Sequence, residues 1–144
     1  MREFLFRGKK CNNGKWTEGG IYTDENKTYI IHTYQYIPDT RDWDTVEFYE
    51  NNPHYKVGYI AVDPETIGQY TGLTDIYGIK VFEGDIIKCY TGRICKVTFF
   101  TAPSYSGFDL TAIDNLDKPA PHSWRLFEDM EVIGNIYDNP ELLI

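Results

Sequence analysis

The sequence has few of the residues on which metal sites and disulfide frameworks depend. It contains three cysteines, Cys11, Cys89 and Cys95, an odd count without any Cys-x-x-Cys pair. We therefore expect free thiols, with Cys89 and Cys95 serving as small buried hydrophobes. The three histidines lie far apart and show no metal-ligand spacing. The sequence predicts neither a bound metal nor a cofactor.

Positive charge and long apolar runs are also scarce. The 14 lysines and arginines are outnumbered by 22 acidic residues, for a formal net charge of -8. Such a chain repels the backbone of DNA or RNA, so nucleic acid is not the partner we expect. No apolar run approaches the roughly 20 residues that cross a bilayer. The start "MREFLFRGKK" lacks the sustained apolar region of a secretory signal. We expect a cytoplasmic protein with no membrane partner.

What the sequence does have is an alternation of β-branched and aromatic residues, while strong helix formers are few. This pattern predicts strands in most windows, beginning with a hairpin that turns at "NNG", residues 12–14. Further strands are expected at 29–37 and at 56–63. The segment 38–56 is the least regular, and a short helix at 42–50 is expected there, capped by Asp39 or Thr40. "DPET" at 63–66 predicts a turn or one helical turn.

The stretch after Asp85 predicts a hairpin of defined register. In "DIIKCYTGRICKVTFF" the odd positions are mostly apolar and the lysines are even, so odd residues should pair with odd residues. This parity requires a loop with an odd number of residues, most simply Thr91-Gly92-Arg93, although such a loop prefers glycine at its last position. Cys89 and Cys95 would then lie opposite each other on the inward face.

Glycines and acids punctuate residues 69–90, "QYTGLTDIYGIKVFEGDIIKCY". We interpret Gly72 and Gly78 as turn residues with positive φ, and Gly84-Asp85 as a corner from which a strand departs. A phosphate-binding loop would lead into a helix and carry Lys-Ser or Lys-Thr, whereas these glycines lead into strands. Asp85 is interpreted as a side chain that bonds its local backbone.

No residue pattern assigns catalytic residues. Glu83 and Asp85, or Asp75 with either, could act as an acid and base in a hydrolase of a sugar or nucleotide, which remains an alternative. The serines of the chain lie in expected loops without a nucleophile-elbow pattern.

Aromatic residues are the least ordinary feature. The chain has 12 tyrosines, and their density around 29–36 exceeds what one small core absorbs. Tyr29, Tyr34 and Tyr36 are therefore candidate interface residues, because tyrosine is favoured where a partner covers a surface. The alternative is that the rings simply cover the half-exposed face of a sheet. A lesser alternative is a binder of single-stranded nucleic acid in which Tyr34 and Tyr36 stack on bases, but the cations for it are missing.

Five blocks of the sequence resemble, in the same order, blocks of the YopX-like family of bacteriophage and prophage proteins. They are "MREFLFRGK", "NGKWTEGGIY", "PETIGQYTGL", "YGIKVFEGDIIK" and "EVIGNIYDNPELL". The resemblance runs along the chain except for a variable segment near 33–58. It implies a mainly β fold of coiled, bifurcated antiparallel sheet, or pseudo-barrel, with at most one or two short helices. It also implies a phage or prophage origin and no established activity. Tyr77-Gly78 stands where relatives often have a more polar turn.

Taken together, these patterns predict one domain over residues 1–144. We expect an accessory protein of a bacterial host's cytoplasm that is not an enzyme. It would act by self-association as a homo-oligomer and by binding a host or phage protein.

Overall fold

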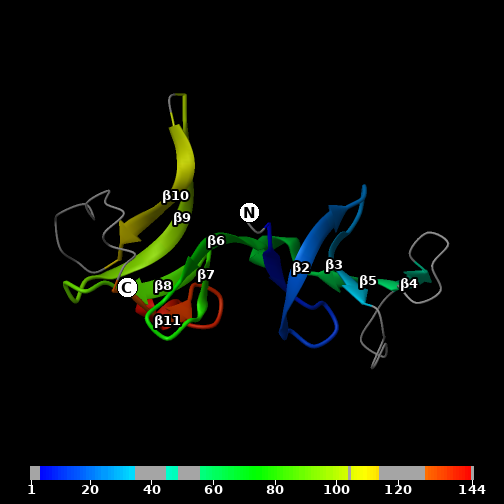
Figure 1. The fold of residues 1–144 in the computed structure, drawn as a ribbon, viewed down its shortest axis with the longest axis horizontal. Coiled ribbons are helices and arrows are strands. Elements are labelled where there is room, and N and C mark those ends of the chain that lie inside the picture. Colours follow the sequence, from blue (N-terminus) through cyan, green and yellow to red (C-terminus); the bar gives the residue numbers. More distant parts are fainter. Residues whose placement is uncertain (1–3, 35–44, 49–55, 104, 114–128, 144) are drawn as a thin grey trace. The chain divides into compact units, whose positions relative to one another are not determined.

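The computed structural model describes most of the chain, as strands, turns and two short helices (Figure 1). The described residues are 4–34, 45–48, 56–103, 105–113 and 129–143. They divide into two compact units, one of residues 4–69 and one that begins at Tyr70, called here the first and second units. The expectation of a single domain over 1–144 stays a prediction.

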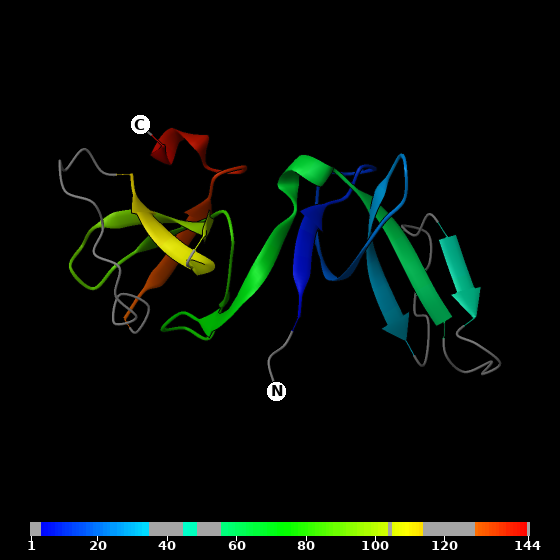
Figure 2. The same ribbon diagram turned by 90° about the horizontal axis from the view of Figure 1, so that it is seen from above.

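The first unit contains five strands of a seven-stranded antiparallel sheet, in the order β4-β5-β3-β2-β1 (Figure 2). Its strands are β1 (Phe6–Lys9), β2 (Trp16–Thr23), β3 (Thr28–Tyr34), β4 (Thr45–Phe48) and β5 (Lys56–Val62). The hairpin with its turn at 12–14 and the strand expected at 56–63 are confirmed, because the period-two pattern marks strands that bury one face. The strand expected at 29–37 is confirmed as far as Tyr34, and residues 35–37 lie outside the described residues.

One expectation for this unit is wrong. Residues 45–48 form strand β4, paired with β5 from Thr45 opposite Tyr59 to Phe48 opposite Lys56, where a helix at 42–50 was expected. The acidic residues that favoured a helix are outweighed by "TVEF", whose β-branched and aromatic residues suit an edge strand. The rest of the expected helix, with Asp39 and Thr40, lies outside the described residues.

A 3-10 helix, η1 (Pro64–Thr66), follows β5. The carboxylate of Asp63 caps it by accepting the backbone N–H of Glu65 at 3.0 Å, and Pro64 supplies a first-turn residue that needs no N–H partner. The turn expected at 63–66 is confirmed in this form.

The core of the first unit lies on one face of its sheet. Ile30, Ile60 and Val62 are at most 3% exposed. Gly8 allows close packing there, because a Cβ atom on it would lie 2.9 Å from Cδ1 of Ile67 and 3.1 Å from Cβ of Val62. The absent side chain therefore lets β1 approach the end of β5.

The second unit contains a four-stranded antiparallel sheet in the order β10-β9-β8-β11. Its strands are β8 (Asp85–Lys88), β9 (Ile94–Ala102), β10 (Tyr105–Ala112) and β11 (Glu131–Asn135). Strand β6 (Gly68–Thr74) begins in the first unit and continues into the second, where it pairs with β7 (Lys80–Phe82), and the 3-10 helix η3 (Pro140–Leu142) follows β11. In Figure 1 the β9–β10 ribbon extends well beyond β8.

The β8–β9 hairpin has the expected parity but a different loop. Ile87 pairs with Cys95, so odd residues do face odd residues. Cys89, however, faces Arg93, whose carbonyl accepts the Cys89 N–H at 2.8 Å. The loop is thus residues 90–92, and it ends on Gly92 with φ of 84°. Parity could not separate the two registers, and the preference of a three-residue loop for glycine at its last position decides between them.

The core of the second unit includes the two cysteines of this hairpin. Cys89 and Cys95 are diagonal neighbours, not opposite each other, and their Sγ atoms are 3.7 Å apart. They are 3% and 1% exposed and pack in one cluster with five other buried residues. These five are Val81, Ile87, Val97, Leu110 and Met130. They form no disulfide with each other, and they pack as small hydrophobes do.

The fold is mainly β, as predicted, with two antiparallel sheets. Within the described part of the chain the helices are two single 3-10 turns, η1 and η3. Among those same residues, no helix has the length and apolarity needed to span a bilayer.

Candidate functional site

Three tyrosine rings gather on one face of the first unit's sheet. Tyr22 on β2, Tyr29 on β3 and Tyr59 on β5 have ring centroids 5.9 to 6.2 Å apart. The Tyr59 ring meets the other two edge-on, at 74° and 87°. This is the geometry that aromatic pairs prefer, with a positive ring edge against a negative ring face. We call these three residues the tyrosine face.

Strand register produces this cluster. Tyr22 pairs directly with Tyr29, and Tyr59 pairs with Ile31, two positions further along β3. Successive residues point to opposite sides of a strand, so Ile30, which is fully buried, fills the core on the other side. The tyrosine face is consequently the outer side of a sheet whose inner side is the core.

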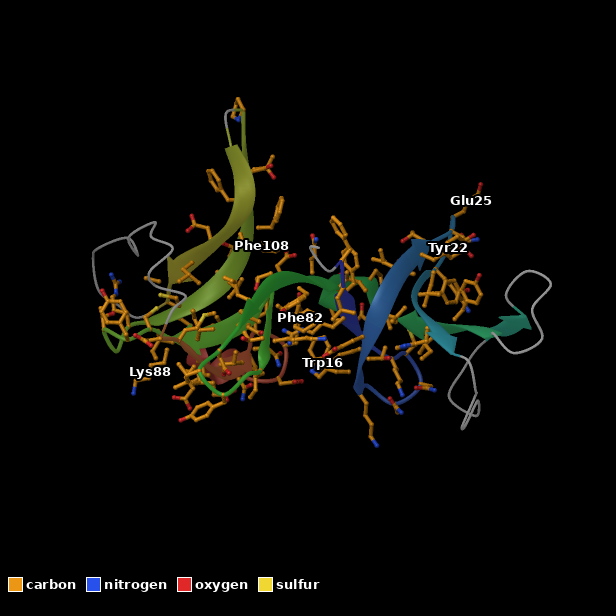
Figure 3. The ribbon with its side chains drawn as sticks, viewed as in Figure 1. Trp16, Tyr22, Glu25, Phe82, Lys88 and Phe108 are labelled. Atoms are coloured by element: carbon orange, nitrogen blue, oxygen red, sulfur yellow. The ribbon has the colours of Figure 1, made fainter. Side chains whose placement is uncertain are left out.

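The tyrosine face is only partly covered. The Tyr22 side chain is 48% exposed, on β2 close to the turn that carries Glu25 (Figure 3). Tyr29 and Tyr59 are half-buried. Rings held by one another lose little further freedom when a partner covers them, and each offers apolar area together with a hydroxyl that bonds water or protein. The arrangement suits recognition of a protein surface.

Of the three candidate interface residues expected from the sequence, Tyr29 is a member of the tyrosine face. Tyr34 lies at the other end of β3, where its backbone pairs with Lys56, and Tyr36 lies outside the described residues. Sequence reasoning missed Tyr22 and Tyr59, because linear density favours neighbours in the chain. Tyr22 and Tyr59 can be recognised as neighbours of Tyr29 only once the pairing of the three strands is known.

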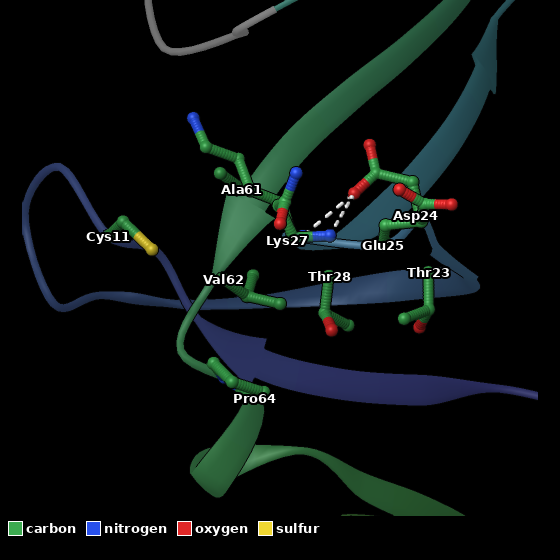
Figure 4. A pocket seen from close by; sticks show the side chains of 10 residues that line it. Cys11, Thr23, Asp24, Glu25, Lys27, Thr28, Ala61, Val62 and Pro64 are labelled. Carbon is green, nitrogen blue, oxygen red and sulfur yellow. Dashed lines mark hydrogen bonds between the residues drawn. The ribbon is translucent and has the colours of Figure 1, made fainter.

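A hollow of about 500 Å³ lies beside the β2–β3 turn (Figure 4). The carboxylate of Asp24 in its wall accepts the N–H groups of Asn26 at 2.9 Å and Lys27 at 2.8 Å. These two bonds hold the pKa of Asp24 below its ordinary value. The hollow is lined by Cys11, Thr23, Asp24, Glu25, Asn26, Lys27, Thr28, Ala61, Val62 and Pro64. The carboxylate of Asp24 thus holds the β2–β3 turn together.

The three candidate hydrolase carboxylates lie in the second unit. Asp75 is buried, and its carboxylate accepts three backbone N–H groups: Tyr77 at 2.8 Å, Ile79 at 2.9 Å and Val132 at 3.1 Å. Burial acts to raise the pKa of Asp75, but the three donors outweigh it and the pKa is lowered. Asp75 therefore joins the β6–β7 turn to β11 as an anion.

Asp85 has a comparable role at the corner before β8. It is 1% exposed, and its carboxylate accepts the N–H of Phe82 at 2.7 Å. Glu83, between them in the chain, is half-buried. A general acid or base needs an oxygen that can reach a substrate proton. The bonding of Asp75 and Asp85 to the backbone is the arrangement of turn residues.

The glycines of the same stretch have backbone conformations that other residues rarely adopt. The φ angles of Gly72, Gly78 and Gly84 are 87°, 78° and 91°. Gly84 is also crowded, since a Cβ atom there would lie 3.3 Å from Cε2 of Tyr137, whereas one on Gly72 or Gly78 would meet nothing within 4 Å. The Gly84 N–H donates to the carbonyl of Val97 at 2.9 Å, which fixes the corner against β9.

Metal-ligating residues do not converge in the part of the chain that is described, where no group of three His, Cys, Asp or Glu side chains could hold an ion. His32 instead forms a 3.0 Å hydrogen bond through Nε2 with Oγ1 of Thr17. Burial and the charge of Lys10 lower the pKa of His32, so its neutral form is favoured.

Among solved structures, the chain is similar in fold to protein EF1440 from Enterococcus faecalis. The two chains are 23% identical, the match covers 100% of each, and the TM-score is 0.54. No curated protein matches the chain. A family model described as YopX protein matches residues 5–144. The chain therefore belongs to the YopX protein family.

Proposed function

We propose that this chain is a phage or prophage accessory protein of the bacterial cytoplasm that acts by binding proteins, its own copies included, and performs no catalysis. The tyrosine face carries the proposal. Three packed rings on the outer side of a sheet form an amphipathic, preorganised surface of the kind that protein interfaces use. The resemblance of the chain to phage proteins supports the proposed origin.

The charge of the chain supports a protein partner over a nucleic acid. A net charge of -8 opposes a polyanion at long range. It also favours encounter with a basic protein surface, because opposite fields raise association rates. A host or phage protein with a basic rim around an apolar centre would complement the tyrosine face.

The alternative of a carboxylate hydrolase has less support. Asp75 accepts three backbone N–H groups, and its pKa is lowered, whereas a general acid at neutral pH needs a raised pKa. Asp85 is buried against the Phe82 N–H. Both residues are better suited to holding turns than to transferring protons.

The proposal is tested by truncating the tyrosine face and following binding. In a Tyr22→Ser, Tyr59→Ser double variant, two of the three rings are lost from a surface whose inner side is unchanged. We expect at least about tenfold weaker binding, because aromatic anchors at an interface are commonly worth over 1 kcal/mol each. Tyr90→Ser is the matched control, since Tyr90 is 62% exposed on a loop of the second unit.

The assay has two arms. Light scattering across micromolar concentrations measures self-association, and capture from a bacterial host lysate with mass spectrometry identifies other partners, whose affinities are then measured with purified protein. Weaker binding in the double variant but not in Tyr90→Ser supports the proposal. Binding that is equal in all three proteins contradicts it, as does a strict monomer that captures nothing.

A further inference from the structure

Among the described residues, no strand pairs with one backbone edge of the outer half of β9, which is called here the open edge. β9 pairs with β8 only from Ile94 opposite Lys88 to Lys96 opposite Ile86, and one further bond joins Gly84 N–H to the Val97 carbonyl. β10, by contrast, pairs with β9 out to Ala102. Within the described part of the chain, residues 98–102 of β9 therefore have a paired strand on one side only.

The alternation of the ladder identifies the groups that face this open side. In an antiparallel strand the N–H and C=O of one residue point to the same side, and the next residue points to the other. The carbonyls of Arg93 and Val97 bond to the β8 side, so odd residues of β9 face that side. Phe99 and Thr101 consequently direct two N–H donors and two C=O acceptors toward the open edge.

The two outer edges of this sheet, on β11 and β10, carry groups that oppose pairing with another chain. On β11, the Val132 N–H is bound by the Asp75 carboxylate and the Met130 carbonyl accepts the Ile76 N–H at 3.1 Å. On β10, the carboxylate of Asp109 accepts the N–H of Leu110 at 2.8 Å. Covering groups and charges of this kind normally keep strand edges from pairing with other chains.

The open edge of β9 carries none of these devices in its own sequence. Residues 98–102 are "TFFTA", without a charge or proline. Phe99 is 45% exposed and Phe100 49% exposed, and they lie on opposite faces of the ribbon. Phe99 packs edge-on against Phe108, labelled in Figure 3, with ring centroids 5.2 Å apart. A ribbon of two strands is at best marginally stable in water, so this ribbon gains from a further strand.

We propose that this edge is a self-association site at which β9 of one chain pairs antiparallel with β9 of a second copy, about a two-fold axis at Phe100. In that register Phe99 lies opposite Thr101 of the second copy, and Thr101 opposite its Phe99, which makes four N–H···O=C bonds. Phe100 then lies opposite Phe100 of the second copy in a non-hydrogen-bonded pair, where side chains are closest.

The shape of the site favours a second copy over an unrelated peptide. The open stretch is short, bounded by the Gly84 bond at Val97 and by the hairpin turn at Pro103. A single peptide would gain few bonds there and would lose its own freedom. A second copy instead brings a preformed ribbon that has the same need, and joins two ribbons into one four-stranded sheet. This inference concerns a surface of the second unit and does not depend on the tyrosine face.

A charge swap at Phe100 tests the two-fold register. In Phe100→Lys and in Phe100→Glu, like charges would lie directly opposite each other and an aromatic pair would be lost, so each variant should self-associate about tenfold or more weakly than the natural chain. An equimolar mixture of the two variants should recover association as mixed dimers. Sedimentation equilibrium measures both effects, with circular dichroism to verify folding.

Two further variants sharpen the result. Thr111→Glu, like Phe100→Glu, adds a negative charge to the face of the ribbon that carries Phe100. It lies on β10, opposite Lys96, and should leave association unchanged. Phe100→Thr replaces the ring with a small, uncharged β-branched residue that strands favour, so it remains informative should a charged variant fail to fold. It should weaken association without any recovery on mixing with Phe100→Lys.

Amide hydrogen exchange supplies a readout specific to edge pairing. As protein concentration rises, the N–H groups of Phe99 and Thr101 should become protected, while that of Phe100, which faces β10, should not change. A monomer at all concentrations overturns the inference, as does association that survives both charged variants or that Thr111→Glu weakens equally. Association lost in the Tyr22→Ser, Tyr59→Ser variant but kept in the Phe100 variants overturns this inference and supports the tyrosine face.

Discussion

Replacing Asp75 with asparagine tests how the second unit holds its β6–β7 turn against β11. One carboxylate oxygen accepts the N–H groups of Tyr77 and Ile79, and the other accepts the N–H of Val132. Asparagine keeps one acceptor oxygen for the first two donors. Its NH₂ group, however, faces the Val132 N–H, so two donors meet where a donor and an acceptor met before.

The expected loss of stability follows from the hydrogen bonds that Asp75 accepts. A hydrogen bond to a charged group contributes about 1.5–3 kcal/mol, and a buried donor left without an acceptor costs about 1–3 kcal/mol. Loss of the Val132 bond, with weakening of the other two, should lower the free energy of unfolding by about 3 kcal/mol. Asp63→Asn is the matched control. Asp63 accepts one N–H at the start of η1, and asparagine caps such a turn about as well as aspartate.

The same substitution has a pH signature. The folded-state pKa of Asp75 is lower than its unfolded value, ordinarily about 3.9, so its stabilising contribution is complete above that value. The contribution is lost as pH falls through the folded-state pKa, because the unfolded chain then binds the proton more readily. The stability difference between the natural chain and Asp75→Asn should therefore shrink in acid.

Urea unfolding at a series of pH values measures these quantities. A difference at neutral pH below about 0.5 kcal/mol would refute the reasoning, since it would mean that the Val132 bond contributes almost nothing. A difference that stays constant down to the acid limit would refute the argument from the lowered pKa. Equal losses in Asp75→Asn and Asp63→Asn would show a general effect of charge and not of these bonds.

Two further predictions concern the corner at Gly84 and the three thiols. Gly84→Ala should destabilise more than Gly72→Ala in urea unfolding, because both incur the cost of positive φ, about 1–2 kcal/mol, and only Gly84 also brings a Cβ atom to 3.3 Å from a Tyr137 ring carbon. Equal losses would show that the ring moves aside without cost. Of the three thiols, exposed Cys11 should react at once with an aromatic disulfide reagent, and buried Cys89 and Cys95 only after unfolding. Rapid reaction of all three would contradict the tight packing of that core.

Local chemistry accounts for much of what could be predicted from the residues alone. The alternation of apolar residues marked the strands at 16–23 and 56–62, because a half-buried strand must place every second side chain inward. "DPET" combined a capping aspartate with a first-turn proline and formed η1. The hairpin after Asp85 had the expected parity, since any other parity would bury its lysines.

The errors arose where local signals conflict or say too little. Acidic residues favoured a helix at 42–50, but residues 45–48 pair with β5 and form a strand. Parity left two registers of the β8–β9 hairpin, and the one that places Gly92 at positive φ prevailed. Cys89 and Cys95 are near each other in either register, which is why their burial was predicted and their diagonal relation was not.

The sequence by itself determined that this is a mainly β chain, because alternation and turn residues act within a few positions of each other. Its match to a family model over residues 5–144 shows that it belongs to the YopX family. Only the tertiary structure decided which rings form the tyrosine face and which strand edge is open. Tyr22, Tyr29 and Tyr59 come from three strands, and they meet because hydrogen-bond registers between those strands align them. In the described part of the chain, the β9 edge is open because β8 is shorter than the ribbon beside it. Such a difference in pairing is a relation between strands that no single stretch of residues encodes.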